Sequence, residues 1–176
     1  LEGRCYIVAV QRAVPDRSWV WEDAAEQHAD PLQVAIAVTE RLVRDKPIDP
    51  ERMSVFGICS GGNAAWEAVL RRPDLFSAMV PCGSAGTSHT ERLDRLVDMP
   101  IWAFNNTRDP GVDIESIRGT VARLQALGGS VHLTEYPSFD HDAWGKAIED
   151  ERAVSWLIEQ RRGLNWLARK PGSPPE

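Results

Sequence analysis

Residues 53–73 read MSVFGICSGGNAAWEAVLRRP, and this stretch decides the fold. It begins with a short apolar run that is typical of a buried strand. Gly61 and Gly62 then lead into an amphipathic helical pattern, which Pro73 ends. The stretch therefore predicts a strand, a tight turn and a helix in succession.

The same alternation of short apolar runs and helical patterns continues on both sides of this stretch. Asp30 and Pro31 are typical of the N-cap and first residue of a helix that ends near Asp45. The predicted strands are 5–10, 53–58, 78–82, 101–105 and 131–136, and the predicted helices are about 31–45, 61–72, 90–97, 113–127 and 151–161. Strands and helices in alternation form βαβ units. We therefore expect an α/β fold, a three-layer sandwich with a mostly parallel sheet covered on both faces.

Length and composition limit the possible functions. The 176 residues suffice for one domain, which we expect over residues 1–165, followed by a proline-containing tail over 166–176. A net charge of −6 disfavours nucleic-acid binding, which needs a positive surface. No apolar run approaches the ~20 residues of a membrane span, so we expect none. Cys5, Cys59 and Cys82 lack the paired spacings of a disulfide framework or a metal site, and no cofactor is implied.

Residues 57–61, GICSG, lie where a nucleophile elbow places its reactive side chain, at a strand-to-helix junction. Glycines flank such a nucleophile because a Cβ there would collide with neighbouring backbone. Only Cys59 has glycine at both flanking positions, whereas Ser60 would have Ile58 at one. A thiol at a helix N-terminus ionises more easily and attacks carbonyl carbons. The alternative is that Cys59 is a small buried apolar residue, but the glycines favour the nucleophile.

A thiol nucleophile needs a histidine base, and His141 is the best candidate. It follows the predicted strand 131–136 by a short loop, as expected for a histidine at the carboxyl end of the last strand. His132 lies inside that strand and should be held in or under the sheet. His28 and His89 precede the acid or lie in variable loops.

The acid that orients this histidine should follow the strand 101–105, which favours Asp109. Asp113 competes, but it has a sufficient structural role as the N-cap of the next helix. Asp140 and Asp142 are less favoured, because immediate neighbours of a histidine seldom reach its ring nitrogen. The backbone N–H of Ser60, the residue after the nucleophile, is the expected oxyanion donor.

Several segments, in one order, resemble the esterase and predicted-peptidase branch of the α/β-hydrolases, near the polyhydroxybutyrate-depolymerase-like and the feruloyl or acetylxylan esterases. The matching segments are 49–57, 65–67, 72–81, 100–104, 134–137 and 141–144. The resemblance covers nearly the whole chain and implies an α/β-hydrolase sandwich with an ester-cleaving triad. The family usually has Ser at position 59, although dienelactone-hydrolase relatives use Cys.

Two further departures concern the edge of the site. The family's His-Gly oxyanion segment should precede the first strand, but this sequence contains no His-Gly dipeptide. We therefore expect the chain, which starts at Leu1, to lack the first strands of its sheet. Asn105 and Asn106 stand where the family commonly has His-Gly before the acid, which should alter the edge of the site more than its mechanism.

The expected function is hydrolysis of carboxylic esters through Cys59, His141 and Asp109, with an acyl-enzyme intermediate. A small-molecule or saccharide-linked ester is the implied substrate. The main alternative is a non-catalytic hydrolase-fold module that binds a ligand or partner. A weaker one is anion binding at the glycine-rich turn, which leaves Asp109 and His141 unexplained. Four tryptophans either line a cleft or belong to the core: Trp19, Trp21, Trp102 and Trp144.

Overall fold

The computed structural model describes residues 5–10, 30–149 and 151–163. The chain divides into two compact units, residues 1–50 and 51–176. The tail expected over 166–176 lies outside the described residues, as do His28, Trp19 and Trp21.

The first unit contains one helix, α1 (Pro31–Asp45), among its described residues. Asp30 is its N-cap, and the Asp30 carboxylate accepts the backbone N–H of Leu32 at 2.9 Å. This helix start confirms the prediction. Residues 5–10 were predicted to form a strand and do not. An apolar run becomes a strand only where a neighbouring strand completes its hydrogen bonds, and the four described strands all belong to the second unit.

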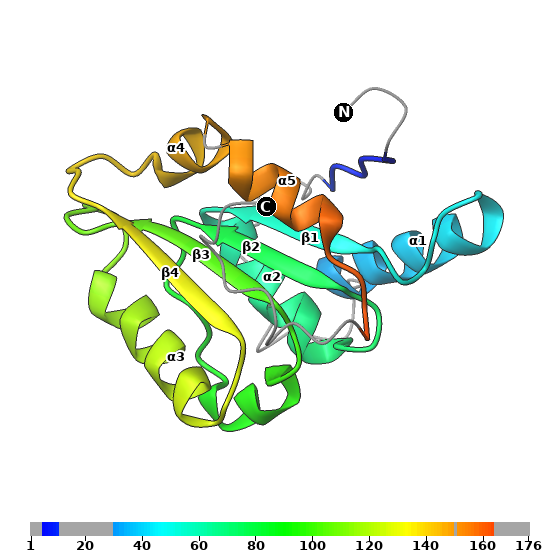
Figure 1. The fold of residues 1–176 in the computed structure, drawn as a ribbon, viewed down its shortest axis with the longest axis horizontal. Coiled ribbons are helices and arrows are strands. Elements are labelled where there is room, and N and C mark those ends of the chain that lie inside the picture. The colour runs from blue at the N-terminus through cyan, green and yellow to red at the C-terminus, as the bar shows by residue number, and fades with distance from the viewer. Residues whose placement is uncertain (1–4, 11–29, 150, 164–176) are drawn as a thin grey trace, which may run out of the picture. The chain divides into compact units, whose positions relative to one another are not determined.

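The second unit is built on a parallel sheet of four strands in the order β1-β2-β3-β4 (Figure 1). The strands are β1 (Ser54–Ile58), β2 (Ala78–Cys82), β3 (Ile101–Asn106) and β4 (Val131–Tyr136). All four agree with the predicted strands to within one residue at each end. Because the strands are parallel, their carboxyl ends meet at one edge of the sheet, where the loops after them lie side by side.

Helices follow each strand, as α2 (Ser60–Arg71), the short 3₁₀ helix η1 (Thr90–Leu96), α3 (Ile114–Ala126), α4 (Ala143–Glu149) and α5 (Glu151–Glu159). The predicted helix over 90–97 is therefore a 3₁₀ helix, a form used in short pieces. The helix α4 was not predicted. Within the described ranges, every helix falls short of the length and apolarity that a membrane crossing demands.

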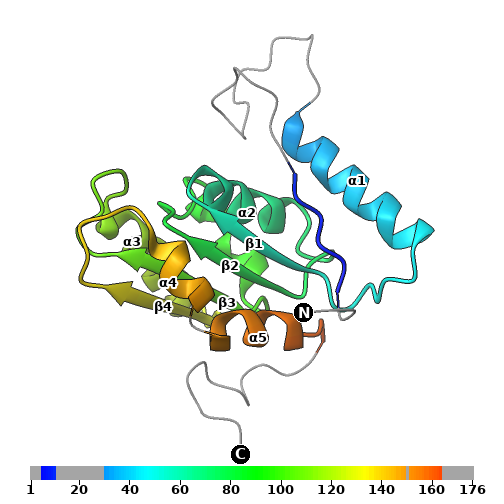
Figure 2. The same ribbon diagram turned by 90° about the horizontal axis from the view of Figure 1, so that it is seen from above.

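The sheet is the middle layer of three, as expected from the sequence. The helices α2 and α3 lie on one face, and α4 and α5 lie on the other (Figures 1 and 2). Under α4 and α5 a buried apolar cluster forms between the helices and the two central strands. It comprises Ala78, Val80, Cys82, Trp102, Phe104, Ala147, Ala153 and Leu157. Burial of both faces explains why β2, and β3 up to Phe104, are apolar.

Candidate active site

Cys59 forms a sharp turn between β1 and α2. Its backbone has φ 56° and ψ −121°, and it is the sole non-glycine residue with positive φ among the described residues. Two backbone hydrogen bonds hold the turn. The Cys59 N–H donates to the Cys82 carbonyl at the end of β2 at 2.9 Å, and the Cys59 carbonyl accepts the Gly62 N–H at 2.9 Å. Such strained conformations persist only where the surroundings fix them, and they cluster at functional sites.

The glycines around this turn differ in why they are needed. A Cβ on Gly57 would lie 2.3 Å from the Gly61 carbonyl oxygen, and a Cβ on Gly62 would lie 2.7 Å from the Cβ of Ser84. A Cβ on Gly61 would meet nothing within 4 Å. The expectation that both glycines flanking Cys59 exclude a side chain is therefore right for Gly57 and wrong for Gly61. The positive φ of Cys59 supports the same choice of nucleophile independently.

This difference predicts the outcome of two matched substitutions. Gly57→Ala should destabilise the fold by about 3 kcal/mol, because its methyl group would overlap backbone that cannot move aside cheaply. Gly61→Ala should leave stability unchanged or raise it by up to about 1 kcal/mol, because alanine favours helix and the space is open. Thermal or urea unfolding of both variants measures this. Equal effects at the two positions would contradict the geometry.

His141 and Asp109 form a hydrogen-bonded pair at the carboxyl edge of the sheet. Asp109 lies in the loop after β3 and His141 in the loop after β4, and the neighbouring strands bring the two loops together. His141 Nδ1 lies 2.6 Å from Asp109 Oδ2. The Asp109 side chain is fully buried, whereas that of His141 is 30% exposed. Asp109 Oδ1 accepts the backbone N–H groups of Gly111 at 2.7 Å and Val112 at 3.2 Å, so both carboxylate oxygens are engaged.

The Cys59 thiol interacts with the imidazole of His141. This interaction is the largest cause of a raised pKa of His141; partial burial acts in the opposite direction, and the Asp109 carboxylate again raises the pKa. Of the three side chains predicted from the sequence, Asp109 and His141 are thus hydrogen-bonded, and the Cys59 thiol raises the pKa of the same imidazole. The arrangement can transfer a proton from sulfur to nitrogen and stabilise the imidazolium that results.

The His141 ring is also held by packing. The ring of Trp144 meets it edge-on, with 5.2 Å between centroids. Gly83, at φ 56°, lies on another side, where a Cβ would approach His141 Cε1 to 3.4 Å. Trp102, in contrast, is a core residue whose indole N–H donates to Thr134 Oγ1 at 2.8 Å. Of the two cleft candidates within the described residues, Trp102 and Trp144, it is thus Trp144 that lies beside His141.

The competing acid and histidines have other positions. Asp113 caps α3, where its Oδ1 accepts the Glu115 N–H at 3.1 Å. His89 lies at the start of η1 beside Glu91. His132 lies in β4 within the sheet, as predicted, but its side chain is exposed and makes a T-shaped contact with Trp102 on the edge strand.

Ser60 is the first residue of α2. The first N–H groups of a helix have no partner within that helix, so the Ser60 N–H is available to an oxyanion beside Cys59. The asparagines at the end of β3 are both buried and hydrogen-bonded: Asn105 Nδ2 donates to the Ser84 carbonyl at 3.0 Å, and Asn106 donates to Asp140. We identify no second oxyanion donor among the described residues.

Cys82 lies outside this arrangement and is more deeply buried than Cys59. It is fully buried, and burial, reinforced by the charge of Asp142, raises the pKa of its thiol to about 12. It therefore stays protonated near neutral pH and is a poor nucleophile. Cys5, Cys59 and Cys82 are all free thiols. Within the described ranges, no cluster of His, Cys, Asp and Glu is arranged to hold a metal ion.

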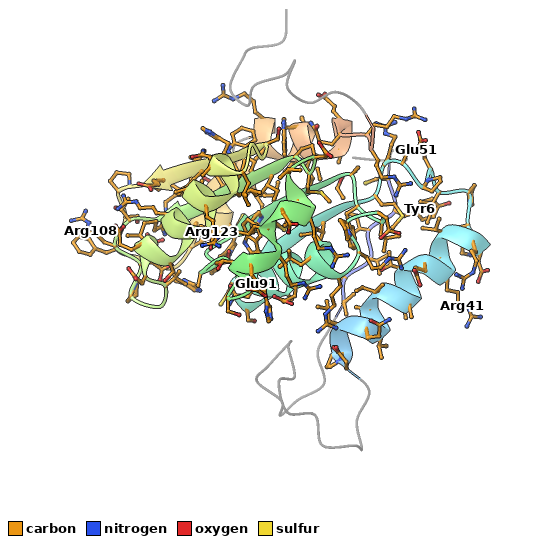
Figure 3. All side chains as sticks on the ribbon, turned by 90° about the horizontal axis from the view of Figure 1, so that it is seen from below. Tyr6, Arg41, Glu51, Glu91, Arg108 and Arg123 are labelled. Carbon is orange, nitrogen blue, oxygen red and sulfur yellow. The ribbon has the colours of Figure 1, made fainter. Side chains whose placement is uncertain are left out.

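The rim of the site carries an exposed cation and an exposed aromatic ring. Arg108, next to Asp109, places its guanidinium 3.5 Å from the ring centroid of Phe139. The two residues come from the loops that hold Asp109 and His141, and Figure 3 shows Arg108 projecting outward at this end of the sheet. The contact joins the two loops at the surface. The sequence contained no pattern that pointed to it.

Comparison with solved structures identifies esterases and other hydrolases. A thermostable esterase has 30% sequence identity and a TM-score of 0.74 over 82% of this chain and 41% of its own. SOBER1 of Arabidopsis thaliana has 19% identity and a TM-score of 0.59 over 72% of this chain and 61% of its own. The fluorophosphonate-binding serine hydrolase FphF of Staphylococcus aureus has 16% identity and a TM-score of 0.61 over 74% of this chain and 64% of its own. The chain thus spans less than two thirds of each.

No curated protein matches the chain significantly. Residues 11–157, however, match the dienelactone hydrolase family, and this range includes Cys59, Asp109 and His141. The matched range covers most of the chain, and the fold agrees with the α/β-hydrolase neighbours. The chain therefore belongs to the dienelactone hydrolase family of the α/β-hydrolase superfamily.

Proposed function

We propose that the chain hydrolyses carboxylic esters through a Cys59–His141–Asp109 triad and a thioester intermediate. Membership of the dienelactone hydrolase family supports hydrolase activity. The observation that carries the finer proposal is the 2.6 Å bond between His141 Nδ1 and the buried Asp109, and the Cys59 thiol supports it by raising the pKa of the same imidazole. Placement in the esterase branch is part of the proposal, and the 30% identity to a thermostable esterase supports it.

In the first half of the reaction, His141 Nε2 takes the thiol proton while the Cys59 sulfur attacks the carbonyl carbon. The oxyanion of the tetrahedral intermediate accepts the Ser60 N–H. When the intermediate collapses, the bond to the leaving oxygen breaks and His141 returns the proton to that oxygen. In the second half, water gives a proton to His141 and attacks the thioester. The carboxylic acid leaves, and Cys59 regains its proton.

The thiol favours esters with weakly basic leaving groups. A thiolate is itself a good leaving group, so the intermediate returns to substrate unless the other oxygen departs easily or is protonated by His141. Phenyl-type esters should therefore react faster than simple alkyl esters. A small-molecule or saccharide-linked ester with such a leaving group is the proposed substrate. The reaction requires no metal or organic cofactor, no nucleic acid and no membrane.

A non-catalytic binding module is the second candidate. Two observations favour it: Cys stands where the wider family usually has Ser, and the described residues supply one oxyanion donor rather than two. Loss of one such donor typically costs about 10²–10³ in turnover. The loss slows an enzyme without abolishing it, whereas a binding module has no use for an imidazole held between a thiol and a buried carboxylate.

Trapping the thioester tests the proposal. The protein is mixed with p-nitrophenyl acetate, quenched with acid after a short incubation and digested, and its peptides are weighed by mass spectrometry. An acetyl group is expected on Cys59 and not on Cys82, since the raised pKa of about 12 keeps the latter protonated. A protein that releases no p-nitrophenol and carries no acetyl group on Cys59 would support the binding module instead.

A further inference from the structure

The carboxylate of Asp140, the residue before His141, accepts hydrogen bonds from four residues. Its Oδ1 accepts Asn106 Nδ2 at 2.8 Å, the Asp142 backbone N–H at 3.0 Å and Lys146 Nζ at 3.0 Å. Its Oδ2 accepts the Ser138 hydroxyl. These donors come from the end of β3, from α4 and from both sides of His141 in the loop. One carboxylate therefore ties together the segments that surround the histidine.

Asn106 is the buried end of this arrangement. Besides the Asp140 carboxylate, its amide nitrogen donates to the Asp140 backbone carbonyl at 2.7 Å. Asn106 is fully buried at the end of β3, three residues before Asp109. The strand β3, which leads to Asp109, thus also binds Asp140, the residue next to His141. Lys146 binds the loop on both sides of His141, because its Nζ donates to the Asp142 carbonyl at 3.0 Å as well as to the Asp140 carboxylate.

These contacts matter more for the position of His141 than for the stability of the fold. Hydrogen bonds from Ser138 first, and then from Lys146, lower the pKa of Asp140 to about 2, so its carboxylate is ionised at neutral pH. The Asp140 and Lys146 side chains are 54% and 35% exposed, and exposed pairs contribute at most about 1 kcal/mol to folding. Displacing a catalytic group by about 1 Å, in contrast, can cost 10²-fold in rate. Position of the histidine is thus the property most sensitive to these bonds.

We propose that Asp140 is a positioning residue, which holds the loop so that His141 meets both Asp109 and Cys59. The hydrogen bonds that Asn106 and Lys146 donate to its carboxylate fix the backbone on either side of His141. Asp140 itself does not take part in proton transfer, because Asp109 already occupies His141 Nδ1. The inference rests on the proposed ester hydrolysis for its effect on turnover and on the structure alone for its effect on the position of the ring.

Three variants test the proposal. Asp140→Ala removes every bond of the carboxylate, and kcat for p-nitrophenyl acetate should fall about 10- to 100-fold with KM within about twofold. Asp140→Asn keeps an oxygen for Asn106, Lys146 and the Asp142 N–H, and its amide can donate to Ser138, so it should restore most of kcat. Glu135→Ala is the control, because it breaks a carboxylate pair with Arg118, at 2.7 Å, on β4, the strand that precedes the loop of Asp140.

A readout that needs no turnover accompanies the kinetics. The Nδ1 proton of His141, shared with Asp109, is protected from exchange while the ring is held, and proton NMR detects it. The signal should persist in the wild type, Asp140→Asn and Glu135→Ala, and it should be lost or broadened in Asp140→Ala at unchanged overall fold.

The outcomes separate this inference from the proposed function. If the wild type and the variants show the expected NMR signals but the wild type hydrolyses no ester, the proposed function is wrong and the positioning role still holds. If hydrolysis depends on Cys59 and His141 but Asp140→Ala keeps both kcat and the proton signal, the positioning role is overturned. Equal loss in Asp140→Asn and Asp140→Ala would also overturn it, because hydrogen bonding would not be what matters.

Discussion

Cys59→Ala is expected to lower kcat for p-nitrophenyl acetate by at least about 10³-fold, because the loss of a nucleophile removes the covalent route altogether. No neighbouring thiol can replace it. Cys82 lies fully buried in the sheet, and its raised pKa keeps it protonated. The remaining rate would come from the oxyanion donor and from substrate binding alone. Steady-state release of p-nitrophenol over a range of substrate concentrations measures the loss.

The control for this substitution is Cys5→Ala, which removes a free thiol from the other unit of the chain. It should keep wild-type kcat and KM. The variant Cys59→Ala should also keep its unfolding temperature within a few degrees, since Cys59 is only partly buried and its side chain makes no capping hydrogen bond to α2. Wild-type turnover in Cys59→Ala would refute the nucleophile, whereas loss in both alanine variants would point to general damage.

Most of the fold was predictable, because the central strands are buried on both faces. Burial makes β2 and the part of β3 up to Phe104 apolar, which is the pattern of a strand covered on both faces. Chain order and the parallel sheet then placed Asp109 and His141 at adjacent strand ends, and the structure has them 2.6 Å apart. Their catalytic role stays a prediction.

Elements that depend on distant partners were not predictable in the same way. Residues 5–10 have the composition of a strand, but composition does not supply the neighbour that a strand needs. The open space beside Gly61 depends on how α2 leaves the turn. Asp140 was set aside because a neighbour of His141 seldom reaches its ring. That argument was correct for the ring and did not consider the loop, which is what its carboxylate binds.

Asp109→Asn is expected to lower kcat by about 10³- to 10⁴-fold at neutral pH, the size of effect seen when the corresponding acid of a serine protease is amidated. The structure gives the reason. Asp109 Oδ1 accepts two backbone N–H groups, from Gly111 and Val112, so in the variant the amide oxygen must take that place. The amide nitrogen then faces His141 Nδ1 and donates to it. The imidazole is thereby forced to carry its proton on Nε2, which can no longer accept the proton of Cys59.

The matched control is Asp113→Asn, at the acid that competes with Asp109 in the sequence. Asp113 caps α3 by accepting the Glu115 N–H at 3.1 Å and the Ser116 hydroxyl at 3.5 Å, and asparagine caps helices as well as aspartate does. Turnover should therefore stay within about twofold. Proton NMR of His141 distinguishes the tautomers directly, since the Nδ1 proton present in the wild type and in Asp113→Asn should be absent in Asp109→Asn. If Asp113→Asn were the slow variant, the acid of the triad would be Asp113, and the short bond between Asp109 and His141 would serve only to hold the loop.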